Sequence, residues 1–202
     1  MEITDRRVTR GHGLLEGFLA RQRARQADSL IPGDARTGRI LDIGCGSYPA
    51  FLRNTQFAER YGLDRVALTD VGGAGITLVE HDITDGTGLP FESSFFDVVT
   101  MLAVFEHIES NSLRGLLLEI RRVLRPGGIY VMTTPVRWTE GILKVMSRLT
   151  LVSHEEVGEH KAQYSHREVI ALLLEAGYDR SNIGQGTFEL GLNLWAVARR
   201  DR

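Results

Sequence analysis

A short apolar segment that ends in two glycines restricts the fold of this chain more than any other feature. Residues 39–43 read Arg-Ile-Leu-Asp-Ile, and Gly44-Cys45-Gly46 follow. Such a segment predicts a buried strand that enters a tight turn, because glycine lets the backbone turn sharply. Further strands are predicted at Arg60–Asp64, Gly75–Asp82, Phe95–Met101 and Ile129–Thr133. Where such strands alternate with helices, they predict βαβ units and a parallel sheet with helices on both faces.

The remaining segments complete an α/β chain. Apolar residues at helical spacing, with turn residues after them, predict four helices, at Leu14–Ala27, Ala50–Arg60, Leu113–Leu124 and Ser165–Ala176. The last of the predicted helices ends at Gly177, and Pro126-Gly127-Gly128 are expected to stop the third helix and turn the chain into the next strand. Two strands are expected to close the chain, at Ser181–Glu189 and Leu190–Ala198. We expect one domain over residues 1–202, with a helical lead-in at 1–38 and a helical lid inserted at 136–163.

Charge, cysteine content and the lengths of apolar runs limit the partners and the location that the sequence allows. The 24 basic and 26 acidic residues nearly cancel, so no nucleic-acid partner is expected. Cys45 is the single cysteine, which excludes an internal disulfide and a cysteine zinc cluster. No apolar run is long enough to cross a bilayer, and the charged amino-terminal segment lacks the apolar core of a secretion signal. We therefore expect a cytoplasmic protein without integral membrane contact.

Acidic residues stand at the ends of three of the predicted strands. Asp42 precedes the glycine turn. Asp64 lies 22 positions after Asp42, at the end of the second strand, and Asp82 ends the third strand. Ligands of open α/β sheets bind at the carboxyl ends of the strands, so these acids are expected to share one crevice. Asp42 could bind a ligand ammonium, Asp64 the hydroxyls of a ribose, and Asp82 an adenine amino group beside the backbone of Ile83. Taken singly, the glycines could form a plain turn, and Asp64 or Asp82 a helix cap or solvated turn.

A dinucleotide-binding oxidoreductase uses a similar turn and a similar ribose acid. Its glycine signature requires a third glycine three positions after the second. Here Gly46 is followed by Ser47, Tyr48 and Pro49, so that third glycine is missing. The sequence therefore disfavours a pyrophosphate ligand and favours a cofactor that carries an ammonium and a carboxylate.

The ordered motifs resemble the class I S-adenosylmethionine-dependent methyltransferases, especially the type 11 group. The resemblance covers roughly residues 38–200 and includes six elements in order: LDIGCG at 41–46, Asp64, Asp82, LPF to FDVV at 89–99, Glu106-His107, and RVLRPGG at 122–128. It implies a Rossmann-like, seven-stranded, mostly parallel sheet whose last strand is antiparallel. It also implies S-adenosyl-L-methionine as cofactor, S-adenosyl-L-homocysteine as product, and these cofactor-binding residues: Asp42, Gly44, Cys45, Gly46, Asp64, Arg65, Asp82, Ile83, Met101, Leu102 and Phe105.

Methyl transfer needs reactants held in line, and it needs a base only where the acceptor must lose a proton. His107 follows the fourth strand and is the candidate base, and Glu106 could orient it or contact a ligand. Alternatively, His107 starts a helix and bonds locally.

The predicted lid would shape the acceptor pocket. Trp138 begins an apolar series at helical spacing, which either covers the acceptor, touches a membrane surface, or simply packs on the sheet. The resemblance suggests that His160 and Tyr164 also face the acceptor. We expect a small or lipid-linked acceptor with peripheral membrane contact as an option, and the alternative is a non-catalytic sensor or scaffold that binds the cofactor. His154, His160 and His166 follow no zinc spacing, so no metal site is predicted.

Overall fold

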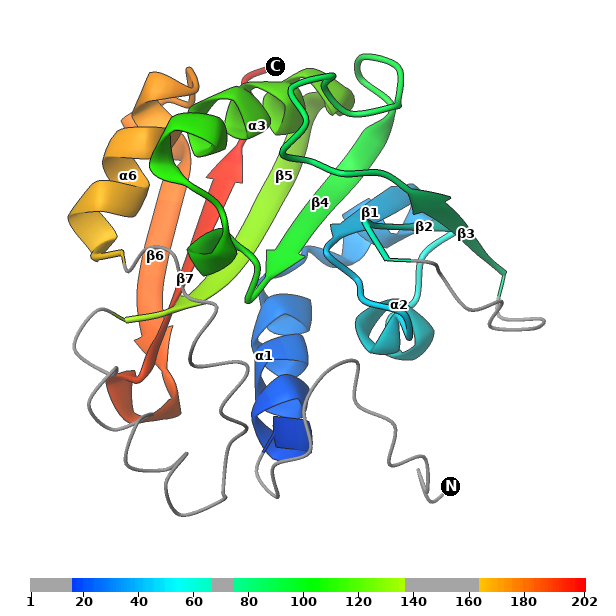
Figure 1. Ribbon diagram of the computed structural model, residues 1–202, viewed down its shortest axis with the longest axis horizontal. Coiled ribbons are helices and arrows are strands. Elements are labelled where there is room, and N and C mark those ends of the chain that lie inside the picture. The colour runs from blue at the N-terminus through cyan, green and yellow to red at the C-terminus, as the bar shows by residue number, and fades with distance from the viewer. Residues whose placement is uncertain (1–15, 67–74, 137–163) are drawn as a thin grey trace.

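A computed structural model of the chain describes residues 16–66, 75–136 and 164–202. Seven strands form one sheet in the order β3-β2-β1-β4-β5-β7-β6 (Figure 1). The pairs among the first five strands are parallel, and β7 runs antiparallel to both β5 and β6. This is the seven-stranded, mostly parallel sheet that the sequence predicts, and that prediction is confirmed. The strands are β1 (Arg39–Ile43), β2 (Glu59–Asp64), β3 (Ile76–Glu80), β4 (Phe96–Leu102), β5 (Leu124–Pro135), β6 (Ile183–Phe188) and β7 (Asn193–Arg199).

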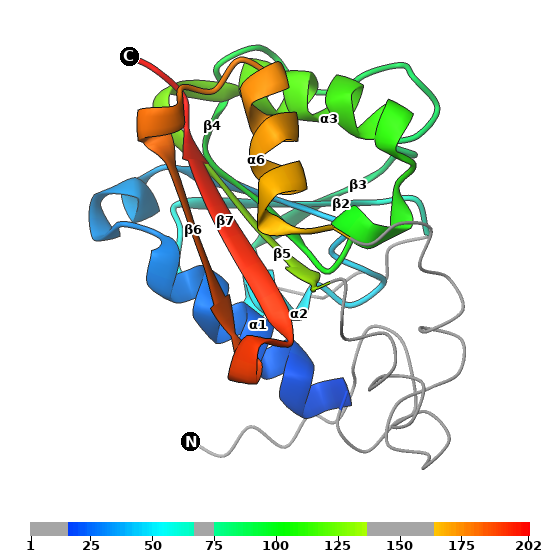
Figure 2. The same cartoon turned by 90° about the vertical axis from the view of Figure 1, so that its left-hand side faces the viewer.

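Helices cover the sheet on both faces (Figures 1 and 2). On one face, α1 (Glu16–Leu30) and α2 (Ala50–Asn54) bury an apolar cluster that includes Ala27, Leu52 and Val98. On the other face, α3 (Ser110–Val123) and α6 (His166–Glu175) enclose the larger cluster. Because side chains alternate along a strand, the consecutive apolar residues of the central strands supply both clusters. None of the helices within the described residues is long and apolar enough to cross a membrane.

The predicted helix at Ala50–Arg60 is wrong in its second half. The helix ends at Asn54, and Glu59 already pairs with Arg39 in the sheet. The buried Thr55 is extended, and its hydroxyl donates to Asp28 Oδ1 of α1 at 2.8 Å. This contact and the pairing of β2 with β1 outweigh the local helical pattern.

The Pro-Gly-Gly segment also differs from expectation. The helix α3 ends at Val123, before Pro126, and β5 begins at once. Leu124 pairs with Phe96 and Ile129 with Val98, so residues 125–128 bulge out of the strand. Gly127 lies within this bulge at φ 78°, a conformation that favours glycine.

The boundaries of the first helix and of the last two strands differ by a few residues from those predicted from the sequence. The first helix runs three residues beyond its predicted end, to Leu30. Between β6 and β7, a turn at Glu189–Gly191 replaces the direct junction that the sequence suggests. The predicted lid lies outside the described residues, except for Val136.

Candidate functional site

The glycine turn after β1 closes over the end of β2. The backbone N–H groups of Gly44 and Cys45 donate to the Leu63 carbonyl, at 2.7 and 3.3 Å. The N–H of Gly46 donates to Asp64 Oδ2 at 2.7 Å. Gly44 and Gly46 have φ values of 74° and 70°, in the left-handed region that favours glycine. The turn is thus hydrogen-bonded to the end of the neighbouring strand.

The three acids lie in a staggered row along the carboxyl edge of the sheet. In the strand register Asp42 pairs with Gly62, two residues before Asp64. Asp64 pairs with Glu80, two residues before Asp82. Each step therefore advances by two residues, roughly 7 Å, while it crosses to the next strand. Such a diagonal row fits an extended ligand with several polar groups, and the structure brings the three acids together at one edge.

Asp42 is a buried acid with a neutral hydrogen-bond donor. Only 4% of the residue is exposed, and its Oδ1 accepts from the Thr100 hydroxyl at 2.6 Å. Burial and the charge of Asp64 raise its pKa to about 7, although the Thr100 bond opposes the shift. Asp42 forms no ion pair with any described residue. A ligand ammonium placed there would supply the missing positive charge.

Asp82 lies two residues beyond the end of β3. It is exposed, and its Oδ1 accepts from the N–H and the hydroxyl of Thr84, at 2.8 and 2.7 Å. These bonds lower its pKa, with a smaller contribution from the exposed Arg65 nearby. Ile83 is partly buried against the larger core cluster.

The exit of β4 lies against the glycine turn. A Cβ built on Gly44 would lie 2.3 Å from Val104 Cγ2. Ala103 has a φ of 55°, and its N–H donates to the Thr133 carbonyl at 3.0 Å. The predicted cofactor residues Met101 and Phe105 are fully buried, so their side chains belong to the core, while Leu102 is half-buried. This strand end can therefore offer a ligand its backbone and the side chains of residues 102–104.

Glu106 and His107 follow in a short 3-10 helix, Phe105–His107. Glu106 is buried and its Oε2 accepts from the Thr134 hydroxyl at 2.9 Å, which ties the β4 exit to the end of β5. His107 is half-buried, and its backbone N–H donates to the Val104 carbonyl at 3.0 Å.

Tyr164 is 4% exposed, and its ring packs edge-on against Phe105 at 4.8 Å between centroids. Its hydroxyl lies 3.3 Å from Ser110 Oγ and donates to the Ile108 carbonyl at 3.4 Å. In this structure Tyr164 therefore anchors the start of α6 to the β4 exit. Trp138 and His160 lie outside the described residues.

The structure also describes the surroundings of Cys45 and His166. Burial, followed by the charges of Asp42 and Asp64, raises the pKa of the Cys45 thiol far above its usual range, which disfavours the thiolate form. His166 begins α6, with Nε2 3.2 Å from the Gly186 carbonyl oxygen. Within residues 16–66, 75–136 and 164–202, no three His, Cys, Asp or Glu side chains gather as metal ligands.

Two threonines at the site were not among the residues predicted from the sequence. Thr100 binds Asp42, and Thr134 binds Glu106. Both are buried in strands whose buried side chains are mostly apolar. A polar side chain in such a run was a usable signal, because buried hydroxyls require partners.

Comparison with known proteins agrees with this geometry. Residues 41–132 match the family model described as a methyltransferase domain. The probable methyltransferase PMT24 of Arabidopsis thaliana is 36% identical over 141 residues, 57% of this chain and 16% of that protein. The sterol 24-C-methyltransferase ERG6B of Gibberella zeae is 32% identical over 102 residues, 46% of this chain and 26% of that protein. The chain thus spans about a sixth and about a quarter, respectively, of these two curated relatives.

Solved structures show the same fold. A Haloferax volcanii methyltransferase, solved with the Trm112 methyltransferase activator, superposes with a TM-score of 0.68 at 19% identity, over 92% of this chain and 93% of that one. An S-adenosylmethionine-dependent methyltransferase of Archaeoglobus fulgidus gives a TM-score of 0.67 at 16% identity, over 91% and 94% of the two chains.

The strand order, with β7 antiparallel to β5 and β6, is the fold that the chain shares with these solved structures. By the match of residues 41–132, which are 92 of its 202 residues, the chain is similar to the methyltransferase domain family. The resemblance seen in the sequence is confirmed.

Proposed function

We propose that this chain binds S-adenosylmethionine along the row of Asp42, Asp64 and Asp82 and transfers its methyl group to a small or lipid-linked acceptor. The observation that carries the proposal is the staggered register of these acids beside a glycine turn that is bonded to Asp64. When bound, the cofactor supplies an electrophilic methyl group on a positively charged sulfur.

The donors and acceptors present fit that ligand. Asp42 is buried with an uncharged partner, so it suits an ammonium bound directly or through water. Asp64 accepts from the Gly46 N–H at Oδ2 and from the Val66 N–H at Oδ1, and its carboxylate is assigned to the ribose hydroxyls. Asp82 keeps Oδ2 available beyond its bonds to Thr84 and is assigned to the adenine amino group, with Ile83 beside the ring.

Around the transferred methyl group, most residues position the reactants, and His107 is assigned the role of base. Glu106, tied to Thr134, fixes the β4 exit, which holds the backbone of residues 102–104 against the glycine turn. In this proposal His107 accepts a proton from an acceptor hydroxyl or amine during attack. Rigid positioning of this kind supplies much of the rate in an in-line displacement.

The acceptor class rests on indirect support. The near-neutral charge disfavours a polyanionic acceptor, and one relative is by name a sterol methyltransferase. The apolar helix face that the sequence predicts along 138–149 would complete an apolar acceptor pocket or contact a membrane surface. We assign Trp138, His160 and Tyr164 to this side of the site, with Tyr164 as the anchor of the segment that follows the lid.

A screen for release of S-adenosylhomocysteine tests the activity. Purified protein is incubated with S-adenosylmethionine and panels of sterols, quinones, small amines and phenols. We expect turnover with at least one member, lost in the Asp64→Ala variant. If the protein binds the cofactor but none of the acceptors yields product, the sensor or scaffold alternative gains support.

The role of His107 is tested with the acceptor that the screen identifies. For a hydroxyl acceptor, His107→Ala is expected to lower kcat by about 100-fold. Turnover near the wild-type rate would show that His107 is not the base.

A further inference from the structure

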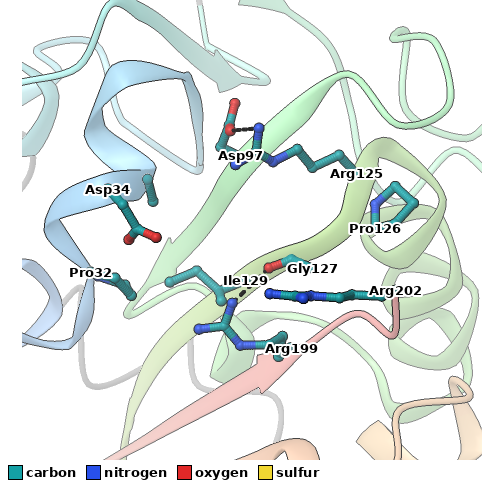
Figure 3. A pocket seen from close by; sticks show the side chains of 10 residues that line it. Pro32, Asp34, Asp97, Arg125, Pro126, Gly127, Ile129, Arg199 and Arg202 are labelled. Atoms are coloured by element: carbon teal, nitrogen blue, oxygen red, sulfur yellow. Dashed lines mark hydrogen bonds and ion pairs between the residues drawn. The ribbon is translucent and has the colours of Figure 1, made fainter.

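A cavity lies at the edge of the sheet opposite the proposed cofactor site. It has a volume of about 150 Å³. Its lining comes from the turn after α1, the start of β4, the bulge of β5 and the end of β7 (Figure 3). These are the amino ends of the parallel strands, whereas Asp42 and Asp64 lie at their carboxyl ends. The cavity is therefore a separate feature of the fold.

The walls combine an apolar base with charged side chains. Pro32, Ala35, Pro126 and Ile129 supply apolar surface. The charged residues that line the cavity are Asp34, Asp97, Arg125, Arg199 and Arg202.

One acid and one base in this cavity neutralise each other. Asp97 is 7% exposed, and its Oδ1 forms an ion pair with Arg125 Nη1 at 2.6 Å. Its Oδ2 accepts from the Arg39 backbone N–H at 2.7 Å. A Cβ on Gly38 would overlap this carboxylate at 2.0 Å, so Asp97 is closely enclosed. Asp97 and Arg125 thus add little net charge.

Arg199 and Arg202 carry the remaining positive charge of the cavity. Arg199 Nη1 donates to the Gly127 carbonyl at 2.8 Å, which fixes the guanidinium but leaves its charge unbalanced. Neither arginine forms an ion pair with any residue that the structure describes. Figure 3 shows both guanidinium groups directed into the cavity beside Ile129. Two arginines against the single further acid of the lining, Asp34, leave a net positive charge that favours an anion.

We propose that this cavity binds a phosphate group, held between Arg199 and Arg202, as inorganic phosphate or as a phosphate monoester. The guanidinium of Arg199 is held in place before binding, and arginine donors match the oxygens of phosphate. Asp34 also lines the cavity and disfavours a larger polyanion, so the site takes a single phosphate group. The apolar surface of Pro32, Ala35 and Ile129 can accept the organic part of a monoester.

Calorimetry at constant ionic strength tests the site, with inorganic phosphate and glycerol 3-phosphate as separate probes. We expect saturable binding of at least one probe to the wild-type protein. The Arg199→Gln/Arg202→Gln variant should bind it at least about tenfold more weakly, equivalent to about 1.4 kcal/mol. Tighter binding of glycerol 3-phosphate would identify a monoester site, and equal or weaker binding a site for phosphate itself. Asp34→Asn should tighten binding, because it removes a negative charge from the wall.

Arg180→Gln is the matched control. Arg180 is exposed and donates to one backbone carbonyl, that of Ile183, as Arg199 does to Gly127, but it lies outside the cavity. Arg202→Gln alone removes no hydrogen bond between described residues and guards against a folding defect of the double variant. The proposal is overturned if the wild-type protein shows no saturable uptake of either probe, or if the arginine variants bind as well as Arg180→Gln. S-adenosylhomocysteine binding, measured in parallel, should be unchanged in every variant, so failure here is distinct from failure of the proposed methyltransferase function.

Discussion

The side chain of Asp42 is almost completely buried, beside a second acid, with one hydroxyl as its hydrogen-bond donor. Such a carboxylate costs free energy when it is charged and the cofactor is absent. The same charge would attract the ammonium of the cofactor. At this residue, folding stability and the proposed binding function therefore oppose each other.

The raised pKa of Asp42 gives a pH dependence of stability with a defined sign. Its value rises from an ordinary 3.8 to about 7, so the folded protein keeps a proton that the unfolded chain releases. The contribution of Asp42 is fully present below pH 3.8 and is lost as the pH rises to about 7. In Asp42→Asn this loss is removed. We expect the variant, free of ligand, to have a higher Tm than wild type at pH 8, measured by calorimetric scanning.

Cofactor binding should depend on the charge of Asp42 in the opposite sense to folding stability, because the charged carboxylate favours binding. Affinity for S-adenosylhomocysteine should fall below pH 7, where Asp42 takes up a proton, and Asp42→Asn should bind about tenfold more weakly at pH 8. A variant that is stabilised and still binds with wild-type affinity would remove Asp42 from the cofactor site.

Gly44 combines a left-handed backbone with a close neighbour. In Gly44→Ala the new methyl group would overlap Val104, which lies 2.3 Å from the built Cβ, at a φ of 74°. We expect a loss of about 2–4 kcal/mol in the free energy of unfolding, measured in urea. Gly86→Ala is the matched control, because Gly86 has a φ of 79° and no atom within 4 Å of its built Cβ. It should lose only about 1–2 kcal/mol. Equal losses would mean that contact with Val104 has no energetic effect.

At the scale of elements, the sequence predicted correctly those strands and helix ends that depend on residues close together in the chain. The central strands were recognised because their buried segments are continuously apolar. The start of α6 was placed correctly to within one residue, since Ser165 and Glu168 form a capping box, a motif encoded within four residues. By contrast, α2 ends where Thr55 reaches Asp28, 27 positions away in sequence, and no local pattern carries that information.

The capping box of α6 is itself open to test. Ser165 accepts from the Glu168 N–H, and Glu168 Oε2 accepts in return from the Ser165 backbone N–H at 2.7 Å. In Ser165→Ala we expect unfolding free energy to fall by about 1 kcal/mol, measured in urea. Ser29→Ala is the control, since Ser29 is exposed and donates only to the Gln26 carbonyl within α1. A change no larger than that of the control would show that the cap does not contribute.

At the scale of the whole molecule, parallel topology explains why the site was partly predictable. Once alternating strands and helices indicate a parallel sheet, acids at strand ends must meet at one edge, so the grouping of Asp42, Asp64 and Asp82 followed from the sequence. The partners Thr100 and Thr134 depend on register across the sheet. The cavity around Arg199 joins segments from both ends of the chain, and sequence order alone does not place them together.

One calorimetric titration tests the central claim, that the row of acids forms a cofactor site. Asp82 and Asp85 offer a matched pair, because each accepts from the N–H and hydroxyl of the threonine two residues later, at 2.8 and 2.7 Å. S-adenosylhomocysteine should bind the wild-type protein and Asp85→Asn with similar affinity, and Asp82→Asn about tenfold more weakly. The absence of any binding heat with folded wild-type protein, or equal affinity in the two variants, would contradict the account.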